Sequence, residues 1–326
     1  MSQTPLVTDI LNSLQIEGYS VLPMGLYDPK YWIKSCFDIA ARKEFLLMIK
    51  IFLNIDKIPS DLIEDLKLIS YFFNGTPLII GNETRKVVLR DEVVYERRGI
   101  PAVNLYTFKH LIKDDKIYVI SRKGGFYVKV DSEKIHRLRL EQELSLQDIA
   151  SKIGVSRKAA YLFERMNQIK EKNAGKLEEV FDESVKFPID IFNWAIEKEE
   201  FHPSMEETDF QAEIKELFEE LGYDIYWAKK APFDGITSEI EESKSRPEEK
   251  CLITDLSLSR KRRIYNRLQM ISEISKFARK LSMFIIEDEK LPRIDNVLIL
   301  QKAILEKMND IKELYEVLKK VKRTFY

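Results

Sequence analysis

The sequence of 326 residues has few of the residues that build disulfide frameworks, metal sites or nucleotide loops. Its two cysteines, Cys36 and Cys251, lie far apart and form no Cys-x-x-Cys pair, so neither a disulfide framework nor a zinc site is indicated. The three histidines, His110, His136 and His202, lack metal-ligand spacing. No glycine-rich phosphate loop is present, because the stretch "RKGG" suits a hairpin turn better. We therefore expect no cofactor and no bound metal.

Long hydrophobic runs and an excess of one charge are also missing. The longest apolar run, "FLLMIKIFL", is interrupted by Lys50 and is too short to span a bilayer. No signal-peptide pattern opens the sequence, so we expect a cytoplasmic protein without a membrane partner. The 53 basic residues face 54 acidic ones, for a net charge of -1. A nucleic-acid site must therefore come from a local concentration of positive charge.

The sequence does have enough apolar residues for more than one packed core. It is 44% hydrophobic and 33% charged, which indicates buried cores and a densely charged exterior. A chain of this length exceeds one ordinary core, so two or three domains are expected.

The stretch "LSLQDIASKIGVSRKAAYLFER" (144–165) reads as two short helices with a tight turn between them. Ser145 can cap the first helix, with Asp148 three residues later in a capping box. Gly154 suits the left-handed turn that ends this helix. Ser156 can then cap the second helix. The pattern is that of a helix-turn-helix.

The two faces of this helix pair differ in character. The apolar positions at helical spacing are Leu146, Ile149, Ala150, Ile153, Ala160 and Phe163, and Ala150 lets the helices cross closely. Arg157, Lys158 and Tyr161 point the opposite way. The preceding "SEKIHRLRLEQE" predicts another helix, with inward-facing positions Ile135, Leu138 and Leu140. From 134 to 165 seven basic residues face four acidic ones.

Residues 131–187 resemble a Cro/cI-type (XRE) helix-turn-helix domain. The resemblance implies binding to double-stranded DNA, with the second helix in the major groove. The DNA-contacting residues would be Gln147, Ser156, Arg157, Lys158, Tyr161 and Arg165. The family often has glutamine where Leu146 stands, and glycine where Met166 stands. We also expect a homodimer, because one such domain reads few base pairs.

The sequences on either side of this helix pair resemble each other. "ILNSLQIEGYSVLP" (10–23) matches "IKELFEELGYDIYW" (214–227), and "CFDIAA" (36–41) matches "PFDGIT" (232–237). Apolar strands and long helices follow in both flanks, so the order α-β-β-β-α-β-β-α is predicted twice. This order gives a mixed sheet with helices on its faces. We interpret it as a duplication.

Each flank resembles the restriction-endonuclease-like fold, in which an Asp and a Glu-x-Lys motif hold a divalent metal for phosphodiester cleavage. In the first flank Asp38 and Lys50 match, but Met48 replaces the carboxylate. In the second flank Asp234 and Asp255 are the carboxylates, and Ser257 stands where lysine belongs. We therefore interpret Asp38, Lys50, Asp234 and Asp255 as vestigial nuclease positions without catalysis.

The whole chain resembles a family of archaeal transcriptional regulators with a Cro/cI-type domain between α/β regions. "ERRGIPAVNLYTFKHLI" and "GGFYVKVDSEKIHRLR" carry the resemblance most clearly. The expected fold class is α/β plus all-α: two restriction-endonuclease-like mixed-sheet domains flank a helical DNA-binding domain. The expected domains are 1–120, 121–190 with a preceding hairpin, and 191–326 with a linker.

A second concentration of positive charge lies at 260–280, where eight basic residues face one acidic residue. Its first four residues, Arg260, Lys261, Arg262 and Arg263, are a candidate second DNA surface. They could instead pair with the acidic helix at 203–224, in the same or another subunit, or simply be solvated.

Three classes of function follow from these observations. The leading hypothesis is a sequence-specific DNA-binding transcriptional regulator that is not an enzyme. The alternatives are a metal-dependent nuclease of the structure-selective or restriction type, and an antitoxin-like or scaffold protein that binds a protein partner. The sequence does not identify a small-molecule effector.

Overall fold

The structure is a computed structural model that describes residues 3–26, 35–196, 207–239, 251–257, 261–287, 291, 293–308, 313–314 and 317. The chain divides into two compact units. The first unit comprises Met1–Glu17, Ile51–Lys57 and Leu78–Trp194, and the second comprises Gly18–Lys50, Ile58–Pro77 and Ala195–Tyr326. The chain passes between the units several times, so neither unit is one continuous segment.

The first unit contains an α/β part, in which helix α1 (Gln3–Ile16) contacts helix α4 (Leu105–Leu111). Its strands are β4 (Gly75–Ile80), β5 (Val93–Arg97), β6 (Ile100–Val103), β7 (Val119–Arg122), β8 (Gly125–Val130) and β10 (Lys186–Phe187). The order β4-β6-β5-β7-β8-β10 mixes parallel and antiparallel pairs. Gly124 and Gly125 turn β7 into β8 with φ values of +100° and +130°, so the predicted hairpin is confirmed.

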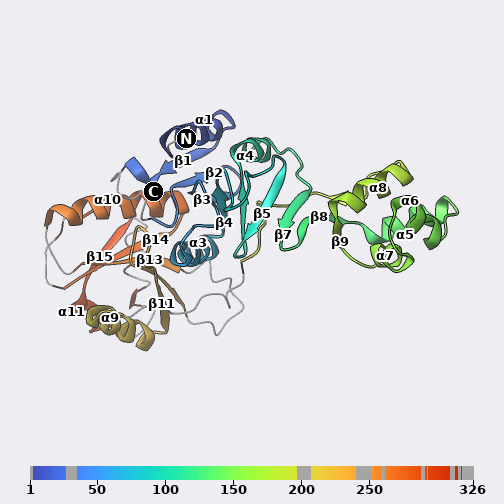
Figure 1. Cartoon of the computed structure of the whole chain (residues 1–326). Coiled ribbons are helices and arrows are strands. Elements are labelled where there is room, and N and C mark those ends of the chain that lie inside the picture. Colours follow the sequence, from blue (N-terminus) through green and yellow to red (C-terminus); the bar gives the residue numbers. More distant parts are fainter. Residues whose placement is uncertain are drawn as a thin grey trace. The chain divides into compact units, whose positions relative to one another are not determined.

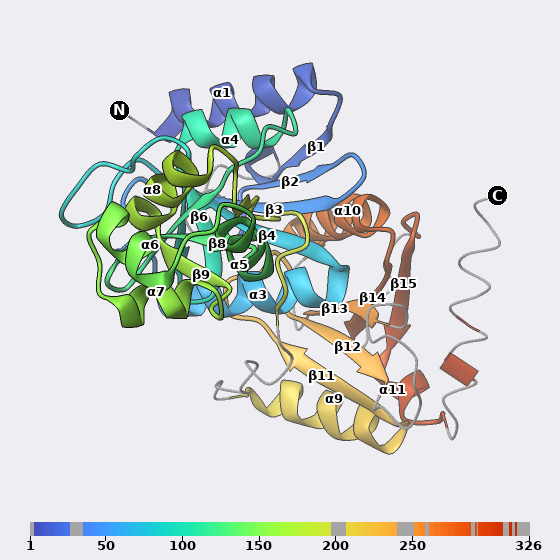
Figure 2. The same ribbon diagram turned by 90° about the vertical axis from the view of Figure 1, so that its right-hand side faces the viewer.

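Four helices and one short strand form the helical subdomain of the first unit (Figures 1 and 2). They are α5 (Ser132–Glu141), α6 (Leu146–Ile153), α7 (Arg157–Phe163), β9 (Gln168–Lys170) and α8 (Glu171–Phe181). Val128 of β8 and Ile169 of β9 are buried in the same apolar core as these helices, and β8 pairs with β9. The helical subdomain is thus joined to the sheet by strand pairing and by a shared core.

The second unit contains elements from both ends of the sequence. From the N-terminal part come β1 (Ser20–Pro23), the 3-10 helix η1 (Met24–Leu26), β2 (Ile39–Arg42), β3 (Leu46–Ile51) and α3 (Ser60–Phe73). The antiparallel order β1-β2-β3 continues into β4. Strand β4 contributes residues to both units.

The C-terminal part of the second unit forms its own five-stranded sheet. Its elements are α9 (Asp209–Glu220), β11 (Tyr223–Trp227), β12 (Gly235–Glu239), β13 (Cys251–Ser257), α10 (Lys261–Ala278), β14 (Leu281–Ile286), β15 (Val297–Gln301) and α11 (Lys302–Leu305). The strands follow in sequence order, first antiparallel and then parallel from β13 onward. The core of this sheet includes Ile214, Phe218 and Met283.

Within the second unit, α3 packs against the C-terminal part. The rings of Phe72 and Tyr226 lie 4.9 Å apart, and Cys251 Sγ lies 3.1 Å from the carbonyl oxygen of Phe72. The backbone N–H of Cys36 donates to the carbonyl of Lys230 at 2.7 Å. Both cysteines are buried, as small apolar side chains usually are.

The two parts of the sequence have closely related element orders. The C-terminal part has the predicted order α-β-β-β-α-β-β-α, from α9 to α11. The N-terminal part has the same order from α1 to α4, with one additional strand, β5, inserted between β4 and β6. The sequence signal had missed β5, which forms an antiparallel hairpin with β6.

Two glycines of the helical subdomain should respond oppositely to alanine substitution. Gly154 ends α6 at φ +73°, which an L side chain adopts at a cost, whereas Gly175 lies inside α8 with open space around it. We expect Gly154→Ala to destabilise the subdomain by about 1–2 kcal/mol. Gly175→Ala should stabilise it by about 0.5–1 kcal/mol, because glycine is a poor helix former.

Hydrogen exchange of the amides in α5 to α8 measures this difference. The matched change in both variants is one methyl group. Equal effects of the two substitutions would contradict the assignment of the α6–α7 turn to a left-handed glycine.

Candidate functional site

Helices α6 and α7 form a helix pair whose ends are capped as predicted. Ser145 Oγ accepts from the N–H of Asp148 at 3.1 Å, and Asp148 Oδ2 accepts from the N–H of Ser145 at 2.8 Å. Gly154 then turns the chain, and Ser156 Oγ accepts from the N–H of Ala159 at 3.1 Å. The capping box, the glycine turn and the second cap are confirmed.

The inner face of this pair is closed by small and apolar side chains. Ile149, Ala150, Ile153, Ala160 and Phe163 are buried, as are Ile135 and Leu138 of α5. The N–H groups of Gly154 and Val155 both donate to the carbonyl of Ala150 at 3.0 Å, which fixes the turn between α6 and α7. The prediction for Leu140 was wrong: it is 55% exposed, because it lies two residues after Leu138, about 200° round the helix and away from the face that Ile135 and Leu138 bury.

The predicted DNA-contacting side chains are all accessible to solvent. Gln147, Ser156, Arg157, Lys158, Tyr161 and Arg165 are all exposed. The Arg165 guanidinium lies 4.5 Å from the centre of the Tyr161 ring. In the part of the chain that the structure describes, Arg157 and Lys158 have no hydrogen bond or ion pair with another side chain. Their charges at the start of α7 are therefore available to an anionic partner.

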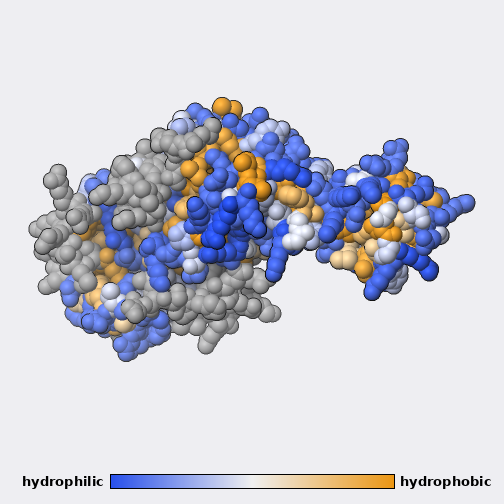
Figure 3. Space-filling view, viewed as in Figure 1, coloured by the Kyte–Doolittle hydropathy of each residue, from blue (hydrophilic) through white to orange (hydrophobic). Residues whose placement is uncertain are grey.

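Two apolar side chains on this surface were not predicted. Leu162 and Met166 are exposed beside Tyr161 and Arg165. Figure 3 shows hydrophobic side chains among hydrophilic ones on the surface of the helical subdomain. Apolar side chains can contact the methyl group of thymine in the major groove. From the sequence, Leu162 had been assigned to neither face of the helix pair.

The C-terminal end of α7 is anchored to α5 through Glu164. Its carboxylate accepts from Arg139 Nη2 at 3.1 Å and lies 2.6 Å from His136 Nδ1. Burial raises the pKa of Glu164, but the hydrogen bonds from Arg139 and His136 outweigh burial and lower the pKa below its ordinary value. Glu164 is therefore an anion that orients α7. This role was not evident from the sequence, because the partners are 25 and 28 residues away.

In the N-terminal part, the vestigial positions Asp38 and Lys50 meet. Lys50 Nζ lies 2.9 Å from Asp38 Oδ1 and 2.8 Å from the carbonyl oxygen of Ser35. Both side chains are about as buried as any in the chain, at 1% exposure. The N–H of Asp38 donates to the carbonyl of Ile49 at 2.8 Å, so strand β3 sets this geometry. Met48 is buried and supplies no oxygen ligand.

In the C-terminal part, an arginine lies between the two vestigial carboxylates. Arg267 Nη2 lies 2.6 Å from Asp234 Oδ1 and also bonds Asp255 Oδ1. Asp234 Oδ2 accepts from the N–H of Leu256 at 2.8 Å. Burial and the neighbouring Asp234 raise the pKa of Asp255 well above its ordinary value, against the opposing effect of Arg267. The pKa of Arg267 is raised: burial lowers it, but both carboxylates outweigh burial.

These residues do not fit a divalent metal ion. The N-terminal pair offers one carboxylate that is already neutralised by Lys50, and hard cations need several converging oxygens. In the C-terminal part the arginine already supplies the positive charge between the carboxylates. Among the described residues no group of three or more His, Cys, Asp or Glu side chains is placed to hold a metal. Arg267 was not identified from the sequence, because only the fold brings α10 next to Asp234 and Asp255.

The candidate second DNA surface falls largely where the structure gives no side chains. Arg260 lies outside the described residues, and for Lys261, Arg262 and Arg263 the structure describes only their place at the start of α10. This surface stays a prediction.

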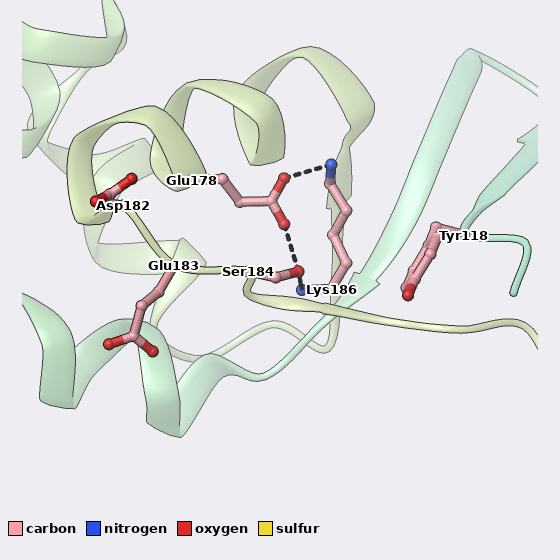
Figure 4. A pocket seen from close by; sticks show the side chains of 6 residues that line it. All are labelled: Tyr118, Glu178, Asp182, Glu183, Ser184 and Lys186. Carbon is pink, nitrogen blue, oxygen red and sulfur yellow. Dashed lines mark hydrogen bonds and ion pairs between the residues drawn. The ribbon is translucent and has the colours of Figure 1, made fainter.

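A shallow pocket lies where α8 meets β10, and Figure 4 shows its lining. The lining residues are Tyr118, Glu178, Asp182, Glu183, Ser184 and Lys186. Glu178 pairs with Lys186 and accepts from Ser184 Oγ at 2.8 Å, so its carboxylate is used to fasten the chain after α8. We assign the pocket a structural role in joining the helical subdomain to the sheet.

Comparison with known proteins places this chain in a family. Residues 3–117 match the PD-(D/E)XK superfamily domain. A protein of Pyrococcus furiosus is 33% identical over 98% of this chain and 97% of its own length. Relatives from Thermococcus kodakarensis (32% identical, 99% of this chain, 98% of the relative) and Methanocaldococcus jannaschii (32% identical, 89% and 90%) are similar. All three are named "putative HTH-type transcriptional regulatory protein".

The fold and the superfamily match define an α/β protein with a PD-(D/E)XK domain. The chain belongs to the family of archaeal proteins that carry the HTH-type regulator name. No solved structure matches it significantly. Within the described residues, no helix is both long and apolar enough to cross a membrane.

Arg267 should be essential for the stability of the C-terminal part. Removing one partner from a fully buried ion pair costs roughly 3–5 kcal/mol. Because about a third of the Arg267 side chain is exposed, we expect Arg267→Ala to cost about 2–3 kcal/mol at neutral pH. Without Arg267, which lowers the pKa of Asp255, burial and the neighbouring Asp234 raise that pKa further, so Asp255 takes up a proton more readily in the folded state. The loss should therefore shrink as the pH falls, and grow as it rises.

Thermal unfolding between pH 5 and pH 8 checks this prediction. Arg267→Lys keeps the charge and is the matched control, with a smaller expected loss. A melting temperature of Arg267→Ala equal to that of the wild type across this range would show that the cluster does not stabilise the fold.

Proposed function

We propose that this protein is a sequence-specific double-stranded DNA-binding transcriptional regulator in which α6 and α7 act as a Cro/cI-type helix-turn-helix. The observation that carries this proposal is the outer face of α7. A doubly capped helix pair presents Arg157 and Lys158 to solvent, and among the residues whose structure is described neither side chain has a hydrogen bond or ion pair. The names of the archaeal relatives support the same function.

The geometry of the pair suggests distinct roles for its exposed residues. Arg157, Lys158 and Tyr161 lie on the outer face of α7, where side chains can reach base edges in the major groove. Gln147 at the start of α6 and Ser156 at the cap of α7 are suited to phosphate contacts. Arg165, stacked on Tyr161, adds positive charge at the other end of α7.

We propose that the α/β parts are scaffolds of the restriction-endonuclease-like type and not nucleases. The PD-(D/E)XK match supports this type for the N-terminal part. The related element order of the C-terminal part supports it there. We keep the division of the chain into segments 1–120, 121–190 and 191–326, and we propose that the middle segment binds DNA.

We further propose a homodimer as the DNA-bound form. α7 has seven residues, so one copy covers only a few base pairs. A two-fold dimer would place two recognition helices about 34 Å apart, one turn of B-DNA. A duplex selected from a random library by the wild-type protein should then contain two related half-sites at this spacing.

Replacing Arg157 tests whether α7 reads sequence. If Arg157 contacts a guanine, Arg157→Ala should weaken binding to the selected duplex by about 1–3 kcal/mol, roughly 5- to 150-fold. Its effect on random DNA should be much smaller, because base readout contributes only to specific binding. Fluorescence anisotropy titrations on the two duplexes at one salt concentration measure the difference.

Lys152→Ala is the matched control, because Lys152 is exposed in the last turn of the preceding helix α6. It removes the same charge away from the start of α7. If Arg157→Ala weakens both duplexes equally, Arg157 is a phosphate contact. If it weakens neither, α7 does not bind DNA as proposed.

A metal-dependent nuclease is the second candidate function. The PD-(D/E)XK match and the Asp38–Lys50 pair favour it. The missing carboxylate at Met48 and the arginine between Asp234 and Asp255 oppose it. We expect the purified protein to leave supercoiled, linear and branched DNA uncut in Mg²⁺ and Mn²⁺, because cleavage by this chemistry needs converging carboxylates.

Gel assays of these three substrates test the expectation. Metal-dependent cutting that is lost in Asp38→Asn or Asp234→Asn would make the nuclease the better hypothesis. Cutting that survives in both variants would point to a contaminating enzyme, and the regulator would remain the better hypothesis.

A further inference from the structure

The loop Thr84–Arg90 of the first unit is a tightly bonded turn, which we call the 84–90 loop. The Thr84 N–H donates to the carbonyl of Val87 at 2.8 Å, and Thr84 Oγ1 accepts from the N–H groups of Lys86 and Val87 at 3.1 and 3.0 Å. The N–H of Arg85 donates to Asp56 Oδ2 at 3.0 Å. Asn54 Nδ2 donates to the carbonyl of Thr84 at 3.0 Å. These hydrogen bonds, within the loop and to Asn54 and Asp56, hold its tip in one conformation.

The same loop is tied to the helical subdomain. The guanidinium of Arg90 pairs with the Glu171 carboxylate through both nitrogens, with Nη1 to Oε2 at 3.1 Å. It also lies 4.7 Å from the centre of the Phe126 ring, and the Arg90 N–H donates to the Tyr95 hydroxyl at 2.9 Å. Glu171 is the first residue of α8, so the loop is fixed at the N-terminal end of this helix.

This end of α8 lies close in sequence to the end of the proposed recognition helix. Residues 164–170 alone connect the last residue of α7 to Glu171. A helix of seven residues is about 10 Å long, whereas a duplex that holds α7 in its major groove continues beyond both ends of the helix. An element fixed beyond the C-terminal end of α7 can therefore meet the flanking backbone of the same duplex.

The exposed side chains of the 84–90 loop have the chemistry to bind a DNA backbone, which has anionic phosphates and apolar sugar edges. Arg85 and Lys86 are exposed, and in the part of the chain that the structure describes neither side chain has a hydrogen bond or ion pair. Val87 and Val88 are 60% and 75% exposed. The neighbouring Asp56 carboxylate interacts electrostatically with Arg85, but its ion pair is with Arg97, at 2.6 Å. The tip thus presents two cations and two apolar groups, and neither cation is held in an ion pair among the described residues.

We propose that Arg85–Val88 is a second DNA-contacting element, which binds the phosphate backbone and sugar edges next to the base pairs that α7 reads. The proposal rests on the proposed function of α7. Through it, the α/β part of the first unit takes part in DNA binding and lengthens the contacted site. The tie between Arg90 and Glu171 keeps the two elements in register on one duplex.

The salt dependence of binding tests this proposal. Each phosphate contact contributes about 0.9 to the slope of log K against log salt. We expect Arg85→Ala/Lys86→Ala to reduce this slope by about 2 and to weaken binding to the selected duplex about 10-fold or more at low salt. The charge-preserving variant Val87→Ser/Val88→Ser should weaken binding without changing the slope. Anisotropy titrations at several salt concentrations give both quantities.

The matched control is Lys113→Ala/Lys116→Ala, which removes two exposed lysines from the segment after α4. It should leave slope and affinity unchanged. Hydroxyl-radical footprints should show a protected stretch of backbone that disappears only in the Arg85/Lys86 variant. If that variant binds as the wild type does while Arg157→Ala is impaired, the loop proposal is wrong and the proposed function stands. If the wild-type protein selects no duplex, both are wrong.

Discussion

In each of the two related parts a carboxylate at a matching position is paired with a cation from the same chain. In the N-terminal part Lys50 of β3 pairs with the buried Asp38. In the C-terminal part Arg267 of α10 bonds the half-buried Asp234 and the buried Asp255, and its single positive charge balances one of these two carboxylates. An uncompensated charge in such a place is costly. The strands and helices around these positions can pack only because the cation arrives from a neighbouring element, so each cluster couples charge balance to the fold.

The same charge balance determines which surface can act on DNA. A metal site needs carboxylates that are free to bind a cation, whereas these carboxylates are bonded to lysine or arginine. The exposed cations of the helical subdomain differ from these carboxylates because they are not paired: Arg157 and Lys158 form no ion pair among the described residues. The carboxylates of these two clusters are thus bonded to cations of the same chain, while the charges of α7 are left to a partner. This distribution supports the proposal that α7 binds DNA.

The elements with strong local signals could be predicted from the sequence. The caps at Ser145 and Ser156 and the turn at Gly154 depend on residues a few positions apart, and the structure has all three. Leu140 was assigned to the core because it is apolar, although helical spacing places it about 200° from Leu138, on the exposed side of α5. Strand β5 was missed because its burial depends on pairing with β6 and β7.

The candidate site shows the same division between local and distant information. The exposure of Arg157, Lys158 and Tyr161 follows from helical periodicity along α7. Asp38 and Lys50 could be assigned to one site because both match a known motif, and the structure places Asp38 just before β2 and Lys50 on the adjacent strand β3. Arg267 and Glu164 could not be assigned, since each acquires its role from partners on another helix or strand. The sequence therefore identifies the candidate carboxylate positions, and the fold identifies the cations bonded to them.

The ion pair between Arg90 of the 84–90 loop and Glu171 of α8 affects how α7 is held. Arg90 is bonded to Glu171 and stacked on Phe126, so the loop and the start of α8 share a rigid attachment to the β8 hairpin. The hairpin also carries Val128 into the core of the helical subdomain. The orientation of α7 is consequently fixed by the sheet through β8, β9 and α8 together, and not by a flexible linker. For the DNA binding that we propose, this attachment would mean that the scaffold of α7 is already in place, which would lower the entropy lost on binding.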